Sequence, residues 1–105
     1  MELINLMGKD VKIIGPNGKE KIEVEKFRRP KIMHSHILLG EINGHQLREI
    51  QTKGIENMPP PKENTLYIVD EIIARTFERA DVIFPWPVTE VRPDVIIAEG
   101  FGRIR

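Results

Sequence analysis

The sequence predicts a small α+β protein dominated by β-structure, a barrel or sandwich of about seven or eight short strands with one amphipathic helix. Two observations carry this prediction. Short apolar runs alternate with turns rich in Gly, Pro and Asn along most of the chain, and helical apolar spacing appears over one stretch, about residues 70–79. The 105 residues leave room for a single domain spanning 1–105, with roughly 6,000 Å² of folded surface.

The first elements are two short strands and a reversal. Leu3–Leu6 and Val11–Ile14 are apolar runs of strand length, separated by polar and glycine residues. Gly15-Pro16-Asn17-Gly18 then has the composition of a tight turn, because proline presets φ and Asn and Gly tolerate positive φ. We expect this turn to fold the chain back into a strand over Lys21–Lys26.

A long hairpin follows, with strands over Lys31–Ile42 and His45–Thr52. Asn43-Gly44 between them is a strong hairpin signal, since a type I′ turn needs positive φ at both central residues. A two-residue loop fixes the register in the absence of a bulge. The expected pairs are Ile42 with His45, Ile37 with Ile50, His36 with Gln51, and His34 with Lys53.

The second half contains the helix. Residues 54–64 hold three consecutive prolines and predict an extended surface connection. Thr65–Val69 then resembles a buried strand, and Asp70 can cap a helix that runs to about Arg79. Val82–Phe84 and Val95–Ala98 are further strands, and the chain then turns into a short final segment. The stripe expected to face the core consists of Ile72, Ile73, Thr76, Phe77 and Ala80.

Composition excludes several classes of function. Sixteen basic and sixteen acidic side chains give zero net charge, which argues against a dedicated nucleic-acid binder. Zero cysteines exclude disulfide scaffolds and cysteine nucleophiles. No signal-peptide or membrane-spanning pattern is present, so we expect a cytoplasmic protein. Abundant isoleucine and glutamate give a composition like that of thermophile proteins.

Three motifs carry a resemblance to a known family. They are Ile4-Asn5-Leu6 before Asp10-Val11, the central segment 40–44, and the block 61–69. With these motifs the chain resembles a family of short uncharacterised proteins from bacteria and their phages, in which Asn-Leu is followed by Thr-Pro-His. Met7, Gly8 and Lys9 stand at those three positions here. The resemblance implies a phage, virus or mobile-element context, hence the host cytoplasm, and no activity.

The histidines are the first candidate site. His34 and His36 lie two residues apart on a strand, about 6.5–7 Å, a spacing from which two imidazoles can ligate one ion. His45 shares their face parity but lies about 20 Å along the ribbon, so no third ligand is at hand. Ser35, the sole serine, projects opposite to its neighbouring histidines. We therefore expect no metal, no cofactor and no catalytic residue.

A basic segment is the second candidate. Residues 26–31 concentrate four cationic side chains around one aromatic, and Arg presents a planar fork of donors to anions. The alternative is a solvated turn between hairpins. An anion- or ligand-binding surface would be formed by Arg28, Arg29, Lys31, His34 and His36.

A proline-spaced apolar segment is the third candidate. Each proline pushes the preceding residue toward extended geometry, so Phe84, Trp86 and Val88 are expected to project to one side as a rigid row. Such a row suits a partner-binding hot spot. The alternative is a lid over the protein's own core.

These observations favour a non-catalytic interaction module that binds a protein partner or itself through the row Phe84, Trp86 and Val88 and exposed strand edges. The alternative is a small-ligand or nucleotide-binding protein that uses the basic and histidine-lined surface for an anionic small ligand. An acid–base enzyme ranks below these, and nucleic-acid binding ranks last.

Overall fold

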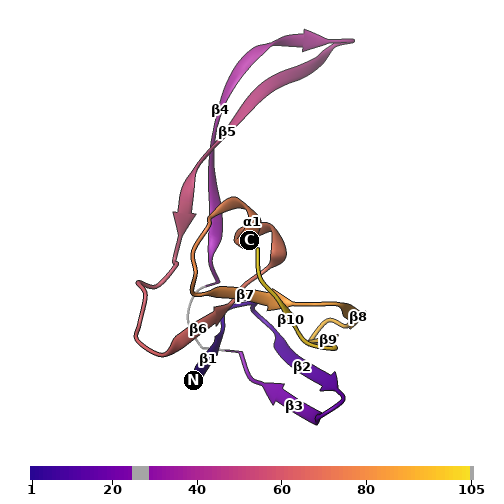
Figure 1. Cartoon of the computed structure of the whole chain (residues 1–105). Coiled ribbons are helices and arrows are strands. Elements are labelled where there is room, and N and C mark those ends of the chain that lie inside the picture. Colours follow the sequence, from indigo (N-terminus) through magenta and orange to yellow (C-terminus); the bar gives the residue numbers. More distant parts are fainter. Residues whose placement is uncertain (25–28, 105) are drawn as a thin grey trace.

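The structure is a computed structural model that describes residues 1–24 and 29–104. The described residues form ten strands and one short helix, which confirms the β-dominated α+β fold as a sandwich-like arrangement rather than a closed barrel (Figure 1). The elements are β1 (Glu2–Asn5), β2 (Asp10–Gly15), β3 (Gly18–Ile22), β4 (Lys31–Ile42), β5 (His45–Glu56), β6 (Thr65–Ile68), α1 (Glu71–Thr76), β7 (Val82–Pro85), β8 (Val88–Val91), β9 (Val95–Ala98) and β10 (Phe101–Gly102).

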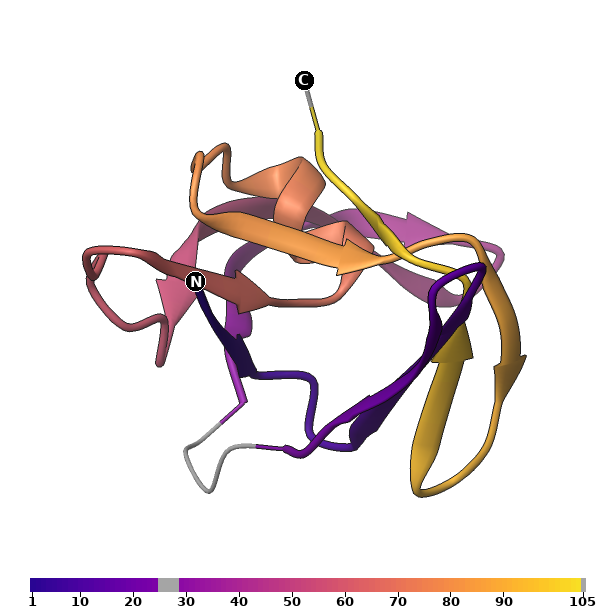
Figure 2. The ribbon, with the colours of Figure 1, turned by 60° about the horizontal axis from the view of Figure 1, so that its bottom comes forward.

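Two four-stranded sheets build the body of the protein, here called the base. The first has the order β1-β6-β7-β10, with β1, β6 and β7 parallel, and the second has the order β3-β2-β9-β8. Figure 2 shows β1, β6 and β7 together on one side of the base and β2, β8 and β9 on the other. The helix α1 connects the parallel strands β6 and β7, as a crossover must.

The first sheet is covered on both faces, which explains why its central strands are continuously apolar. Tyr67 and Phe84 point into a core cluster that includes α1 residues, whereas Ile68 and Ile83 point into a cluster shared with the second sheet. The alternation of neighbouring residues between two clusters places this sheet between the helix and the second sheet. The strand predicted over Thr65–Val69 is confirmed as buried.

One buried polar side chain fastens the end of β1. Asn5 is fully buried; its Nδ2 donates to the carbonyls of Ile22, at 3.0 Å, and Lys9, at 2.8 Å. Its Oδ1 accepts from the Met7 N–H at 2.9 Å. Asn5 therefore joins β1, the loop after it and the end of β3.

The long hairpin does not pack along its length on either sheet. β4 and β5 pair only with each other and rise from the base as a two-stranded ribbon, here called the arm (Figure 1). The principal extents of the chain are 55 × 30 × 28 Å. The hairpin turn is confirmed, because Asn43 and Gly44 have φ of 52° and 82°.

Two bulges change the expected register of the arm. Ile42 pairs with His45 as predicted, but Ile37 pairs with Glu49 rather than Ile50. Leu39 is an extra residue in β4, and Lys53 is an extra residue in β5 nearer the base, so the second bulge cancels the first. The predictions for two further pairs were also wrong: His36 pairs with Ile50, and His34 pairs with Thr52.

The helix is shorter than predicted. It ends at Thr76, because Phe77 already has extended angles of −124° and 100°. The predicted apolar stripe was wrong in part: Ile73 is buried, but Ile72 is 64% exposed and Ala80 is exposed. Asp70 stands at the N-cap without a side-chain capping bond.

The buried amide of Asn5 gives a stability test. We expect Asn5→Ala to lower the free energy of unfolding by about 2–4 kcal/mol, because it removes two or three hydrogen bonds and leaves buried backbone groups without a partner. Asn17→Ala, in the exposed turn between β2 and β3, should change it by less than about 0.5 kcal/mol. Urea unfolding of both variants measures the difference, and equal effects would contradict this role of Asn5.

Candidate interaction surface on the arm

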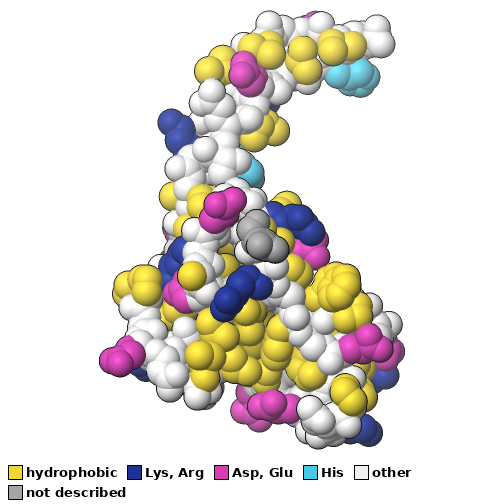
Figure 3. Space-filling model, in the orientation of Figure 1, with side chains coloured by type: hydrophobic (Ala, Val, Ile, Leu, Met, Phe, Trp, Pro, Cys, Tyr) yellow, Lys and Arg dark blue, Asp and Glu magenta, His cyan; other side chains and the backbone are white. Residues whose placement is uncertain are grey.

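Large apolar side chains are exposed along the whole arm. Space-filling Figure 3 shows hydrophobic groups on it from the base to the far end. Between 41% and 67% of each side chain named here faces solvent, which is unusual for a water-exposed ribbon. They are Met33, Ile37, Leu38, Leu39, Ile42, Leu47 and Ile50.

The arm gives the chain more surface than a compact fold of this length. The accessible surface is 7633 Å², against the roughly 6,000 Å² expected from the sequence. The radius of gyration is 16.7 Å, against about 13 Å for a compact domain of this size. An isolated two-stranded hairpin is marginally stable in water, and most of this ribbon has no second layer packed on it.

One face of the arm is more apolar than the other. Cross-strand partners share a face, as do residues two apart on an unbulged strand, so the register assigns each side chain to a face. The face that carries Ile37, Ile42 and Leu47 is here called the aliphatic face. Its members beyond the root are Met33, Ser35, Ile37, Gly40, Ile42, His45, Leu47, Glu49, Gln51 and Gly54, and the pair Lys31–Glu56 continues it at the root.

The opposite face of the arm is held by a polar network. Arg48 lies 2.8 Å from His36 Nδ1 and donates a second bond of 3.0 Å to Gln46 Oε1. Since the guanidinium is always a donor, His36 accepts through Nδ1 in this arrangement. Ile50 and Leu38 lie on this polar face beside the network.

The root of the arm is packed into the base. Ile32 and Ile55 face each other across the ribbon and pack against the core cluster of Tyr67 and Phe84. Pro30, directly before β4, is buried. Arg29 bonds Asp70 at the start of α1, so the chain entering the arm is also fixed by an ion pair.

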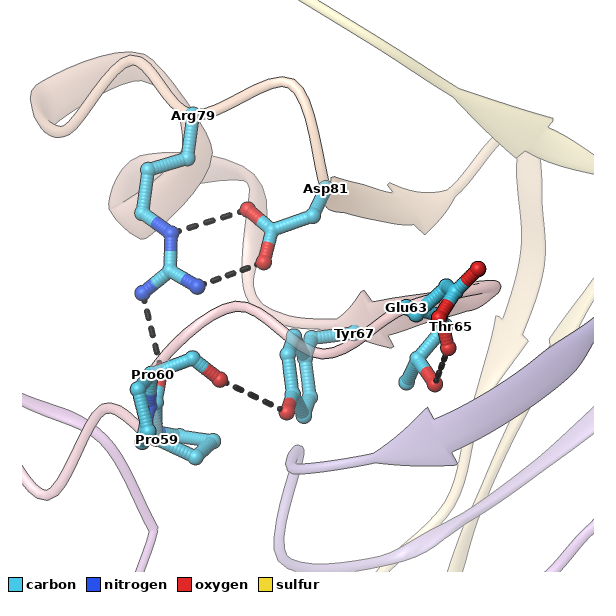
Figure 4. Close-up of polar contacts among 7 residues, drawn as sticks. All are labelled: Pro59, Pro60, Glu63, Thr65, Tyr67, Arg79 and Asp81. Carbon is cyan, nitrogen blue, oxygen red and sulfur yellow. Dashed lines mark hydrogen bonds and ion pairs between the residues drawn. The ribbon is translucent and has the colours of Figure 1, made fainter.

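A second set of contacts holds the chain that leaves the arm (Figure 4). Arg79 forms a two-pronged ion pair with Asp81 and donates to the Pro59 carbonyl at 3.0 Å. Tyr67 donates its hydroxyl to the Pro60 carbonyl at 3.0 Å, and its ring lies 5.9 Å from the Arg79 guanidinium carbon. Because both ends of the hairpin are fastened, the arm has a defined direction relative to the base.

A hydrophobic pocket of about 480 Å³ lies beside the root of the arm. Its apolar lining consists of Ile4, Leu6, Met58, Pro59 and Tyr67. Lys62 lies at the pocket and is ion-paired with Glu2 at 3.5 Å. The pocket is thus mainly apolar, and the charge of Lys62 beside it is balanced by Glu2.

The predicted anion-binding residues do not converge on one point. Arg28 lies outside the described residues. Arg29 is already paired with Asp70, and Lys31 lies across the ribbon from Glu56. His34 and His36 lie further up the arm on its polar face. The segment from Lys31 to His36 spans about 16 Å, so these groups cannot surround a small anion together.

The histidines remain apart, but the expectation that His45 shares a face with His34 and His36 was wrong, because the bulge at Leu39 places His45 on the aliphatic face. His45 lies at the hairpin turn, nine residues along the chain from His36, and Figure 3 shows histidine groups at separate levels of the arm. Within residues 1–24 and 29–104, no three His, Asp or Glu side chains form a group that could hold a metal ion.

The proline-spaced apolar segment is split between core and surface. Phe84 is 4% exposed and belongs to the core, whereas Trp86 is 55% and Val88 45% exposed. The expectation of three side chains projecting to one side was wrong, because β7 buries both of its faces and the chain enters the edge strand β8 only after Pro87. Trp86 and Val88 remain candidates for partner contact.

Two neighbouring charged groups affect one another, Glu90 on the exposed edge strand β8 and Arg92 directly after it. A hydrogen bond of 2.8 Å from Arg92 lowers the pKa of Glu90, and the same bond raises the pKa of Arg92.

Within the described part of the chain, no helix is long and apolar enough to cross a membrane.

Sequence reasoning missed the apolar side chains of the arm as a surface. The two runs predicted a hairpin and its register, but not that its faces stay uncovered. The signal that could have found them is Ile37-Leu38-Leu39, three consecutive apolar residues that break the alternation where the bulge lies.

Comparison with known proteins adds no assignment: no family model, curated protein or solved structure matches the chain. The resemblance to the phage-associated family therefore remains an expectation.

Exposure of Trp86 gives a fluorescence test, because it is the sole tryptophan of the chain. With 55% of the residue exposed, we expect red-shifted emission and ready quenching by acrylamide in the free protein. A blue emission that acrylamide does not reach would contradict the exposed position and favour coverage by a partner or a second copy.

Proposed function

We propose that this protein is a non-catalytic interaction module that binds a protein through its β4–β5 arm. The observation that carries the proposal is the exposure of seven large apolar side chains on a ribbon whose root is packed into the base. A ribbon fixed at its root leaves strand edges and an apolar face exposed, and a partner protein can bind to either of them.

The energetics support a protein-sized partner. Complete burial of an aliphatic side chain contributes about 1.5–3 kcal/mol, so covering the exposed halves of four such side chains on the aliphatic face contributes about 3–6 kcal/mol. A small ligand cannot cover side chains distributed over the length of a ribbon. A second ribbon, sheet or helix can.

The alternative, a protein that binds an anionic small ligand, has one supporting feature. A hollow of about 360 Å³ near the root of the arm is lined by Arg29, Lys31 and Ile72. Asp70 also lines it and already neutralises Arg29, so an anion would have to displace a carboxylate. The arm is therefore the better supported site.

Photo-crosslinking tests the role of the arm. A benzophenone amino acid replaces Leu39 on the arm or, as control, Ile72 on α1; the two native side chains are 56% and 64% exposed. In the native cells, we expect a discrete protein adduct from position 39 and none from position 72, since the partner covers the arm and not the helix.

The composition of the adduct need not be known for this test. Adding Ile37→Glu to the position 39 variant should abolish the adduct, because a carboxylate would be desolvated in the contact. Absence of an adduct at position 39, or equal labelling of both positions, would refute the arm as the contact element.

A further inference from the structure

We propose that the partner on the aliphatic face is a second copy of this chain. The two arms would pack face to face and antiparallel, around a twofold axis that passes between their Gly40–Leu47 pairs. This inference rests on the proposed function and adds the identity of the partner and the geometry of the contact.

The area fits a symmetric dimer. The accessible surface exceeds that of a compact protein of this length by about 1,600 Å² per chain. The twofold superposes only the outer part of the arm, from the Ser35–Gln51 pair to the turn, and leaves Met33 and the root uncovered. Covering this outer part, roughly two-thirds of one face, would remove about 500 Å² per copy. The total is then about 1,000 Å², which is the lower limit for a specific interface.

The order of side chains along the aliphatic face is self-complementary. A twofold axis at the Gly40–Leu47 pair brings the level of Ile42 and His45 in one copy over the level of Ile37 and Glu49 in the other. Ile42 then stacks on Ile37 of the second copy, and the reverse contact forms by symmetry. Apolar side chains therefore meet at three levels, Leu47 on Leu47 at the axis and Ile42 on Ile37 on each side of it.

The charges of this face match under the same operation. Glu49 is the sole carboxylate on the part of this face that overlaps, and the imidazole that meets it is His45 of the second copy. Within one chain, His45 and Glu49 are four residues apart on a strand, about 13 Å, so they do not pair with each other. Dimerisation supplies each carboxylate with a hydrogen-bond donor.

Gly40 leaves room at the centre of the contact. A Cβ built on Gly40 meets no atom within 4 Å, and the residue has φ of 151°. Opposite Gly40 on the ribbon lies Leu47, which is 41% exposed. Two Leu47 side chains related by the axis can spread over the two glycines, so the layers approach without a gap or a clash.

The polar face does not allow the same packing. A twofold axis at its Leu38–Arg48 pair would place two guanidinium groups against each other. The same stacking would desolvate Arg48 and break its bonds to His36 and Gln46. The polar face is thus left to solvent.

Mass measurements on face-matched variants test the proposal. We expect purified wild-type protein to be a dimer by analytical ultracentrifugation across micromolar concentrations. Leu47→Glu should weaken dimerisation at least about 100-fold, because it sets two carboxylates on the axis, whereas Ile50→Glu on the polar face should leave the dimer within about threefold. Circular dichroism of both variants checks that the base remains folded.

A charge exchange tests the antiparallel register. His45→Glu should weaken the dimer about tenfold or more, because it opposes Glu49 of the second copy. Adding Glu49→Lys to the same chain should restore the affinity, since each carboxylate then meets an ammonium across the interface. Failure of the double variant to recover would overturn the register.

Crosslinking locates the axis directly, because the chain has no native cysteine. Leu47→Cys should give a covalent dimer with a short bismaleimide reagent, and Ile50→Cys should not. A monomeric mass at all concentrations overturns self-association. In that case a heteromeric adduct from position 39 would still uphold the arm as a contact element, whereas no adduct at all would refute both.

Discussion

The packing of Ile32 and Ile55 against the core of the base is the contact on which the use of the arm depends. A two-stranded ribbon has two faces and no second layer, so its direction is set only where it meets something else. Here the meeting point is the root, where Tyr67 and Arg79 also hold the outgoing chain through the carbonyls of two prolines. Without these contacts at the root, the exposed aliphatic side chains would have no fixed position relative to the base.

Local patterns predicted the elements well and their partners less well. Asn43-Gly44 identified the hairpin because the turn geometry is determined by those two residues alone. The continuous apolar run over Thr65–Val69 identified a strand covered on both faces. The parallel pairing of β1 with β6 and of β2 with β9 had no local signal, since it joins segments far apart in the sequence.

The surface on the arm was harder to predict than the fold. An alternating strand usually packs one face on a core, and nothing local says that the core ends at Ile32 and Ile55. The register depended on bulges at Leu39 and Lys53, and a shift by one residue changes which side chain faces its partner. Phe84, Trp86 and Val88 were separated by burial, because Phe84 packs in the core cluster beside α1. That packing has no signal in the proline spacing.

The paired bulges also bear on how the arm can change in length during evolution. One residue inserted into a single strand would exchange the faces beyond it and uncouple the hairpin tip from the root. The ribbon instead carries one extra residue on each strand, Leu39 near the tip and Lys53 near the root. The pairing register is therefore shifted by one residue only in the segment between these two bulges. Arms of other lengths would therefore arise most easily from balanced changes on both strands.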